Sequence, residues 1–307
     1  MSEIEAEKSP IIKLTKGWYS YQNCWNYAFS LGQNLVVEEV KKVMPALCQT
    51  TPEKFWYHFS TSFLSSSRYS KICHNLKKYF QWNFPLPYLI HQVYFAGLPF
   101  CIEKGVFIPQ PDTEILFQKT CQLINQNWKN SVGLKILDIG TGCGSLAINL
   151  AKVYPSSQVT ALDISPRALK VVRKNIFLHS VQNVIVKHSN LFSQLEPSEK
   201  FNVIVANPPY IGRQEYNSLS LITKKQPYQA LVAKQKGYFF YQAILSQASA
   251  FITSPFLLLF EIGYQQKKKI LKLIIRCFPT AKVSIFADEK GYSRVIAVAN
   301  NASIAQR

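Results

Sequence analysis

The hydrophobic positions divide the chain into two parts with different periods. In the first 80 or so residues, apolar side chains recur every three or four positions, as at Phe55, Phe59 and Phe63, which predicts amphipathic helices. From residue 134 onward, short apolar runs alternate with segments of helical period. Near-continuous apolar strands separated by helices indicate a parallel sheet that is covered on both faces.

The second pattern predicts the elements of an α/β domain. Strands are expected at 134–139, 158–162, 183–187, 201–206, 256–262, 281–286 and 293–299, and helices at 113–128, 144–153, 166–179, 237–251 and 264–277. Residues 287–292 join the last two strands without a helix between them, so this pair is predicted to be antiparallel. The sheet is therefore expected to be seven-stranded and mostly parallel.

The segment between the two patterns changes character. Pro85 and Pro87 are expected to break any helix there. Two β-like runs follow at Gln92–Phe95 and Phe100–Ile102, and a third at Val106–Ile108. The segment is interpreted as a β-hairpin linker.

Three parts follow from these patterns. Residues 1–83 form a helical unit without a catalytic constellation, for which we expect a role in substrate recognition, the alternative being that it only packs against the catalytic part. Residues 84–111 form the hairpin linker, and residues 112–307 form the catalytic α/β domain. Lengths of this size suit one full domain and a smaller unit.

The composition indicates a basic protein with reduced cysteines. The net charge is +18, and residues 86–307 carry 25 basic against 11 acidic residues, a net of +14. This charge favours proximity to nucleic acid, although a solvated basic surface is the simpler alternative.

The seven cysteines are odd in number and include no CxxC pair, so we expect reduced thiols and no metal site. No run approaches the ~18 apolar residues of a membrane span, and the acidic start at Glu3, Glu5 and Glu7 does not resemble a secretory signal, so a cytoplasmic location is expected.

A glycine-rich turn follows the first predicted strand of the α/β domain. The run Leu134–Gly144 ends in Asp138-Ile-Gly140-Thr141-Gly142-Cys-Gly144 and leads into a helix. Glycines allow a ligand to approach the backbone closely, and the helix N-terminus offers free N–H groups. The spacing Gly-x-Gly-x-Gly after an acid differs from the dinucleotide pattern Gly-x-Gly-x-x-Gly. It resembles the S-adenosylmethionine site of Rossmann-like methyltransferases.

An acid ends the next predicted strand, in Leu162-Asp163-Ile164-Ser165-Pro166. A carboxylate about 20 residues after a glycine loop can accept hydrogen bonds from both ribose hydroxyls. The alternative is that Asp163 only caps the following helix. Ser165 and Pro166 already supply a cap and a first-turn proline, which favours ribose binding.

The third motif, Asn207-Pro208-Pro209-Tyr210, follows the predicted strand 201–206. Ligands of open α/β sheets bind at the carboxyl ends of the strands. The Asn207 side-chain oxygen and the Pro208 carbonyl can each accept one hydrogen of a planar –NH₂ group, and the two prolines preorganise them. Tyr210 offers an aromatic face. No strong general base is evident nearby, so positioning is expected to supply much of the catalysis.

Taken together, these motifs resemble the amino methyltransferases, which include adenine-N6 DNA enzymes and protein glutamine-N5 enzymes. The run Phe107-Ile-Pro-Gln-Pro-Asp112-Thr-Glu114 resembles the Ile-Pro-Arg-Pro-Asp-Thr-Glu signature of release-factor glutamine methyltransferases, and Pro85–Tyr88, Leu259–Tyr264 and Gly291–Val295 add further matches. The resemblance implies a Rossmann-like class I methyltransferase fold. It also implies S-adenosylmethionine as cofactor, S-adenosylhomocysteine as its product, and class I peptide chain release factors as partners, methylated at the glutamine of a Gly-Gly-Gln motif.

The resemblance also implies roles for individual residues. The expected catalytic residues are Asn207, Pro208, Pro209 and Tyr210, and the expected cofactor-binding residues are Asp138, Gly140, Thr141, Gly142, Gly144, Asp163, Ile164, Asn190, Leu191 and Asn207. The expected substrate-binding residues are Phe100, Ile108, Pro109, Asn207, Pro208, Pro209 and Tyr210, with Phe100 and Tyr210 as walls of a slot. Asp112 is expected to cap the helix that follows it, with a cofactor role for Asp112-Thr-Glu114 as the alternative. Glu261, inside a predicted buried strand, is expected to be paired or near the cofactor. The chain departs from the family pattern at Gln110, Asn190 and Gln226, which stand where the family has an arginine, an acid and a glutamate.

Three other functions remain open from the sequence. Adenine-N6 methylation fits the Asn207–Tyr210 motif and the basic charge, but the only candidate for a target-recognition segment is 221–240, with Lys224, Lys225, Lys234 and Lys236. A ribosomal protein could be the glutamine substrate instead of a release factor. A scaffold that has lost catalysis is the third alternative. For the leading function we expect neither a membrane partner nor a direct requirement for nucleic acid.

Overall fold

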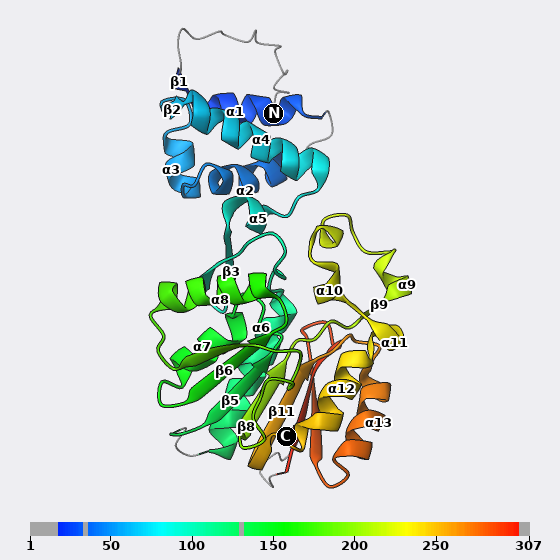
Figure 1. The fold of residues 1–307 in the computed structure, drawn as a ribbon. Coiled ribbons are helices and arrows are strands. Elements are labelled where there is room, and N and C mark those ends of the chain that lie inside the picture. The colour runs from blue at the N-terminus through cyan, green and yellow to red at the C-terminus, as the bar shows by residue number, and fades with distance from the viewer. Residues whose placement is uncertain (1–17, 33–35, 129–131, 301–307) are drawn as a thin grey trace. The chain divides into compact units, whose positions relative to one another are not determined.

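A computed structural model of the chain describes residues 18–32, 36–128 and 132–300 (Figure 1). The acidic residues Glu3, Glu5 and Glu7 lie outside the described part. The chain divides into two compact units, Met1–Ile90 and His91–Arg307. The division falls at Ile90 rather than at residue 83, so the predicted linker is shared between the two units. No helix in the described ranges is long and apolar enough to cross a membrane.

The first unit is helical, as the three- and four-residue spacing predicts, although the helix that contains Phe55 ends at Tyr57, before Phe59 and Phe63. It contains α1 (Tyr21–Ser30), α2 (Val37–Leu47), α3 (Pro52–Tyr57), α4 (Ser66–Trp82) and α5 (Leu86–Ile90), with a short antiparallel pair of β1 (Trp18–Tyr19) and β2 (Leu64–Ser65). Its core includes Met44, Phe55 and Leu76. The expectation that Pro85 and Pro87 break any helix is wrong for α5. Pro87 falls in the first turn, where the missing N–H has no helical partner to lose.

The second unit is built on a seven-stranded sheet with the order β12-β13-β11-β8-β5-β6-β7. The strands are β5 (Lys135–Ile139), β6 (Gln158–Asp163), β7 (Val184–His188), β8 (Phe201–Ala206), β11 (Ile252–Glu261), β12 (Lys282–Ala287) and β13 (Ser293–Ala299). Strands β7, β6, β5, β8 and β11 run parallel, and β13 is antiparallel to both β11 and β12. The predicted mostly parallel sheet with an antiparallel last pair is confirmed.

Helices cover both faces of this sheet (Figure 1). On one face, α6 (Pro111–Asn127), α7 (Ser145–Val153) and α8 (Pro166–His179) pack against alternate strand residues such as Ile136 and Val205. On the other, α12 (Phe239–Ala248) and α13 (Lys267–Cys277) pack against the intervening residues, including Leu137 and Ile204. Because neighbouring strand residues point to opposite faces, a strand buried on both sides is apolar throughout.

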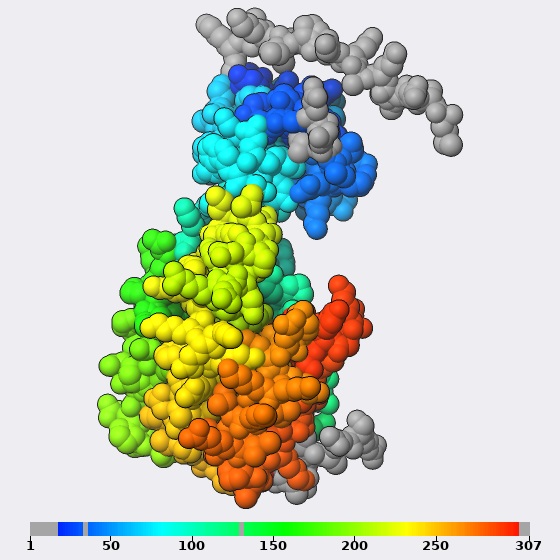
Figure 2. Space-filling model, turned by 90° about the vertical axis from the view of Figure 1, so that its right-hand side faces the viewer, coloured from blue at the N-terminus to red at the C-terminus, as the bar shows by residue number. Residues whose placement is uncertain are grey.

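Two segments differ from the expected pattern. The hairpin forms as β3 (Gln92–Phe95) and β4 (Leu98–Cys101), but the predicted third run, Val106–Ile108, is a loop. After β8 the chain forms an insert of short elements, β9 (Ile211–Gly212), α9 (Arg213–Tyr216), η1 (Thr223–Lys225), α10 (Tyr228–Leu231), β10 (Val232–Ala233) and α11 (Lys234–Gly237). Within the second unit, Figure 2 shows this insert as a yellow-green lobe above the yellow surface of α12. Strands β9 and β10 pair in parallel and close its base.

Candidate active site

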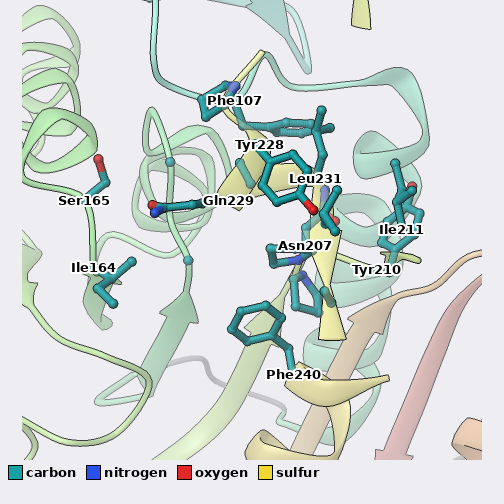
Figure 3. Close-up of a pocket in the computed structure, with 18 of the residues that line it drawn as sticks. Phe107, Ile164, Ser165, Asn207, Tyr210, Ile211, Tyr228, Gln229, Leu231 and Phe240 are labelled. Carbon is teal, nitrogen blue, oxygen red and sulfur yellow. The ribbon is translucent and has the colours of Figure 1, made fainter. Parts of the chain in front are cut away.

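A cavity of about 1210 Å³ lies at the carboxyl ends of β5, β6 and β8, within the second unit. Parallel strands bring their carboxyl ends to one edge of a sheet, and the loops that follow them build a binding site there. Side chains from the loop before α6 and from the insert complete the lining. Figure 3 shows Phe107, Tyr228 and Leu231 on one side of Asn207, with Phe240 on another and Ile164 and Ser165 across the space.

The glycine-rich turn forms one end of this cavity. Gly140, Thr141 and Gly142 line it. Gly144 does not: a Cβ at this position would overlap Val172 Cγ2, and its φ is +86°. Gly144 therefore lets α7 pack closely against α8, and its predicted cofactor contact is replaced by a packing role.

Asp138 lies beneath the glycine turn. Its side chain is 1% exposed and is not among the groups that line the cavity. The Thr141 hydroxyl donates a hydrogen bond of 2.6 Å to Asp138 Oδ2, and burial raises the pKa of this carboxyl to about 7. Asp138 thus fixes the turn from below, through Thr141, rather than facing a ligand.

Asp163 joins the glycine turn to the loop that begins α8. Its Oδ2 accepts a hydrogen bond from the Gly142 N–H at 2.9 Å, and its Oδ1 accepts one from the Ser165 N–H at 2.8 Å. Burial raises the pKa of Asp163. Asp163 lines the cavity together with Ile164, Asn190 and Leu191. The structure therefore brings the predicted ribose-binding acid and the predicted adenine-side residues to the same end of the cavity as the glycine turn.

We expect Asp163→Asn to weaken the binding of S-adenosylhomocysteine about 10- to 100-fold, since hydrogen bonds to a charged group contribute about 1.5–3 kcal/mol. The asparagine has one acceptor oxygen, so it cannot serve both the Gly142 and Ser165 N–H groups. Isothermal titration calorimetry would measure the change. Glu199→Gln is the matched control, because Glu199 pairs with Lys187 and lies away from the cavity. Equal affinities of the Asp163→Asn variant and the unaltered chain would contradict the assignment.

Asn207 and the three residues after it form the floor of the other end of the cavity. Asn207 Nδ2 donates to Thr113 Oγ1 at 2.9 Å, and the Thr113 hydroxyl donates to Glu261 Oε2 at 2.6 Å. The Tyr210 hydroxyl donates to the other carboxylate oxygen, Oε1, at 3.2 Å. Burial and the neighbouring Glu261 raise the pKa of Tyr210, which keeps the phenol protonated. The strand end, the start of α6 and the end of β11 are thus joined by one hydrogen-bond network.

Only some of the residues predicted to bind the substrate line the cavity. Pro109 lines the cavity, but Phe100 and Ile108 do not. Phe100 is 0% exposed and packs against Phe95 and His179. Its prediction as a wall of the slot is wrong, because its position in β4 turns the ring into the core beneath the hairpin. The backbone of Ile108 is tied to the insert, because its N–H donates a hydrogen bond to Gln226 Oε1 at 2.9 Å.

Two of the three residues that depart from the family pattern, Gln110 and Gln226, hold the loop before α6. Gln110 Nε2 donates a hydrogen bond to the Ile108 carbonyl at 2.8 Å. Gln226, in the insert, accepts a hydrogen bond from the Ile108 N–H. Gln110, not Asp112, occupies the cap position of α6. The predicted cap at Asp112 is wrong because Pro111 takes the first helical position and leaves Asp112 inside the first turn, where it pairs with Arg294 at 3.1 Å.

Several groups around the cavity were not predicted. They are Phe107, Thr113, Tyr228, Gln229, Leu231 and Phe240, which line it. Glu261, which is expected from the sequence to be paired or near the cofactor, lies buried beneath the cavity and accepts hydrogen bonds from Thr113 and Tyr210. A signal for Glu261 exists, since a single acid at the end of the apolar run Phe256–Phe260 is unusual for a buried strand. No pattern distinguishes Tyr228 or Phe240 from ordinary aromatic residues, because only the folded insert and the start of α12 bring them close to Asn207.

The sheet order and the cavity at its carboxyl edge define a Rossmann-like methyltransferase. A family model described as "Methyltransferase small domain" matches residues 98–234. The solved structure of the hMettl16 catalytic domain superimposes with a TM-score of 0.51 at 11% identity, covering 80% of this chain and 86% of that one, and shows the fold alone.

Relatives of higher identity specify the family. The release factor glutamine methyltransferase of Fusobacterium nucleatum is 39% identical over 69% of this chain and 59% of that protein. Those of Streptococcus pneumoniae and Lactococcus lactis are each 34% identical, over 70% and 74% of this chain and over 74% and 82% of their own lengths. The chain belongs to the release factor glutamine methyltransferase family, as its motifs predict.

Proposed function

We propose that this methyltransferase transfers a methyl group from S-adenosylmethionine to the side-chain amide nitrogen, N5, of the glutamine in the Gly-Gly-Gln motif of class I peptide chain release factors. The observation that carries this proposal is the placement of Asn207–Tyr210 at one end of a cavity whose other end is the glycine turn and Asp163. Such a cavity has room for a nucleoside cofactor and an inserted peptide side chain together. The names of the relatives support the choice of acceptor.

The residues at the first end fit the cofactor. A backbone turn of Gly140, Thr141 and Gly142 faces the cavity, and the Asp163 carboxylate lies beside it. Asp163 would accept the ribose hydroxyls, and Ile164, Asn190 and Leu191 would surround the adenine. When bound, S-adenosylmethionine supplies an electrophilic methyl group and leaves as S-adenosylhomocysteine.

The residues at the second end fit a primary amide. An amide –NH₂ group has two hydrogens to donate and a delocalised lone pair. The Asn207 oxygen and the Pro208 carbonyl would accept one hydrogen each, which holds the nitrogen in place. Tyr210 and Phe107 would flank the flat amide, and Pro109 would border the entrance. Two glycines before the glutamine would let the acceptor backbone approach closely. Catalysis then rests mainly on positioning. The methyl–sulfur bond breaks as the new N–C bond forms, and the nitrogen then loses one of its two hydrogens to water as a proton.

The test is transfer of radiolabelled methyl groups to four acceptors. They are a class I release factor, the same factor with the Gly-Gly-Gln glutamine changed to alanine, unmethylated duplex DNA, and a ribosomal-protein mixture. We expect label on the unaltered release factor alone, without added nucleic acid. Label on DNA would overturn the proposal in favour of adenine-N6 methylation, and label on a ribosomal protein alone would change the partner. A cytoplasmic location and a substrate-recognition role for residues 1–83 stay predictions.

A further inference from the structure

A buried carboxylate lies beneath the acceptor end of the cavity and has no role in the mechanism above. Glu261 ends β11 and is 2% exposed. Both its oxygens are occupied: Oε2 accepts from the Thr113 hydroxyl and Oε1 from the Tyr210 hydroxyl. Its backbone carbonyl accepts from the Tyr241 hydroxyl at 2.8 Å. Burying a carboxylate is unfavourable unless hydrogen bonds compensate. Because the two hydrogen bonds come from Thr113 and Tyr210, which line the cavity, we ask what Glu261 does for the site.

The direction of each hydrogen bond in this network follows from the number of hydrogens available. An ionised carboxylate only accepts, and a threonine hydroxyl has one hydrogen. The short contact of 2.6 Å is that of a hydroxyl donating to a carboxylate. Because the Thr113 hydroxyl donates its only hydrogen to Glu261, it can only accept a hydrogen bond from Asn207. The partner of Thr113 must be the Asn207 –NH₂ group, at 2.9 Å, and the Asn207 oxygen is left free on the other side.

We propose that Glu261 is a positioning residue, which through Thr113 holds the Asn207 amide with its oxygen toward the acceptor nitrogen and through Tyr210 holds the aromatic wall. The identity of the acceptor as a glutamine amide rests on the proposed function, but the orientation of Asn207 does not. An asparagine amide is nearly symmetric in shape, so packing alone would hardly distinguish its two orientations. The turned amide would point two hydrogens at an –NH₂ acceptor and repel it.

Protonation of Glu261 removes this control. A neutral carboxyl can donate to Thr113, which frees the threonine hydrogen for the Asn207 oxygen and permits the turned amide. Burial raises the pKa of Glu261 to about 7, with Asp112 also raising it and with Thr113, Tyr210 and Arg294 lowering it. Arg294 is itself paired with Asp112 and Asp288. Because the ionised form is the orienting one, methyl transfer is expected to fall as the pH drops through about 7.

Variants separate this role from a purely structural one. Thr113→Val keeps the shape but removes both hydrogen bonds, and we expect kcat/KM for methyl transfer to fall about 10- to 100-fold, with the affinity for S-adenosylhomocysteine retained. Thr113→Ser restores the hydroxyl and should recover most of the activity. Glu261→Gln should lower the rate less, because one orientation of the glutamine still accepts from Thr113. It should also abolish the fall in rate near pH 7, which a structural role would leave in place.

A second measurement does not depend on the acceptor. The protein is labelled with ¹⁵N-asparagine, and the side-chain –NH₂ signals of Asn207 are identified by their absence from the spectrum of Asn207→Gln. These signals are followed from pH 5.5 to 8.5, a range of roughly 1.5 units on either side of the Glu261 pKa. We expect them to shift with a midpoint near 7 in the unaltered protein and to stay constant in Glu261→Gln. Signals that ignore pH in the unaltered protein, or that shift equally in both proteins, would overturn the proposal. If no release factor is methylated, the proposed function fails while this readout still decides the role of Glu261.

Discussion

Asn207→Ala is expected to reduce kcat/KM for methyl transfer by on the order of 10²–10³, the size of effect seen when one preorganised hydrogen-bonding group is removed from a catalytic site. The substitution deletes the acceptor oxygen that would hold the glutamine nitrogen, and it leaves the Thr113 hydroxyl without its donor. The glycine turn and Asp163 lie at the other end of the cavity and stay in place. Affinity for S-adenosylhomocysteine should therefore change far less than the rate.

Initial rates with a release factor and calorimetry with S-adenosylhomocysteine measure the two quantities. Asn202→Ala is the matched control, because Asn202 lies near the start of β8, the strand that Asn207 follows, away from the cavity, and accepts a hydrogen bond from the Lys135 N–H. That variant should keep the full rate. An Asn207→Ala protein that retains the rate of the Asn202→Ala protein would remove Asn207 from the catalytic site.

Gly237→Ala should disrupt the same site from behind. Gly237 has φ +88°, and a Cβ there would overlap the Tyr210 carbonyl oxygen and lie 2.6 Å from Gln266 Nε2. These two groups are hydrogen-bonded at 2.8 Å, so a methyl group must move the backbone of the Asn207–Tyr210 turn or break the bond that supports it. We expect a loss of activity of roughly 100-fold, that of a misplaced reacting group. We also expect a decrease of about 2–3 kcal/mol in the free energy of unfolding.

Methyl-transfer rates and urea unfolding followed by circular dichroism measure these effects. Gly97→Ala shares the backbone strain, with φ +78°, but its Cβ would meet nothing within 4 Å. The control should therefore lose only about 1 kcal/mol of stability and keep its activity. Equal effects of the two substitutions would show that backbone strain, and not the contact with Tyr210, accounts for the loss.

The sequence predicted the fold well where the physical signal is local. Strands such as Phe201–Ala206 are apolar throughout because both faces are covered, and their helices repeat at helical spacing. It was less successful at proline-rich and short segments. Leu86–Ile90 forms a helix although Pro85 precedes it and Pro87 lies in its first turn, and the insert between β8 and α12 is built of elements of two to four residues. Elements this short draw their stability from tertiary contacts rather than from their own period.

The sequence by itself determined the class of protein and predicted most of the motifs that line the candidate site. The glycine turn, Asp163 and Asn207–Tyr210 each follow a parallel strand, and a parallel sheet gathers strand ends at one edge, so these motifs had to meet. Only the tertiary structure decided which residues support them. Thr113 and Glu261 are separated by 148 positions in the chain and are joined by one hydrogen bond. Phe100 faces the core, and Gly144 and Asp138 act from beneath the surface. Contacts of this kind depend on side-chain direction and packing between distant elements, which no local pattern in a single sequence records.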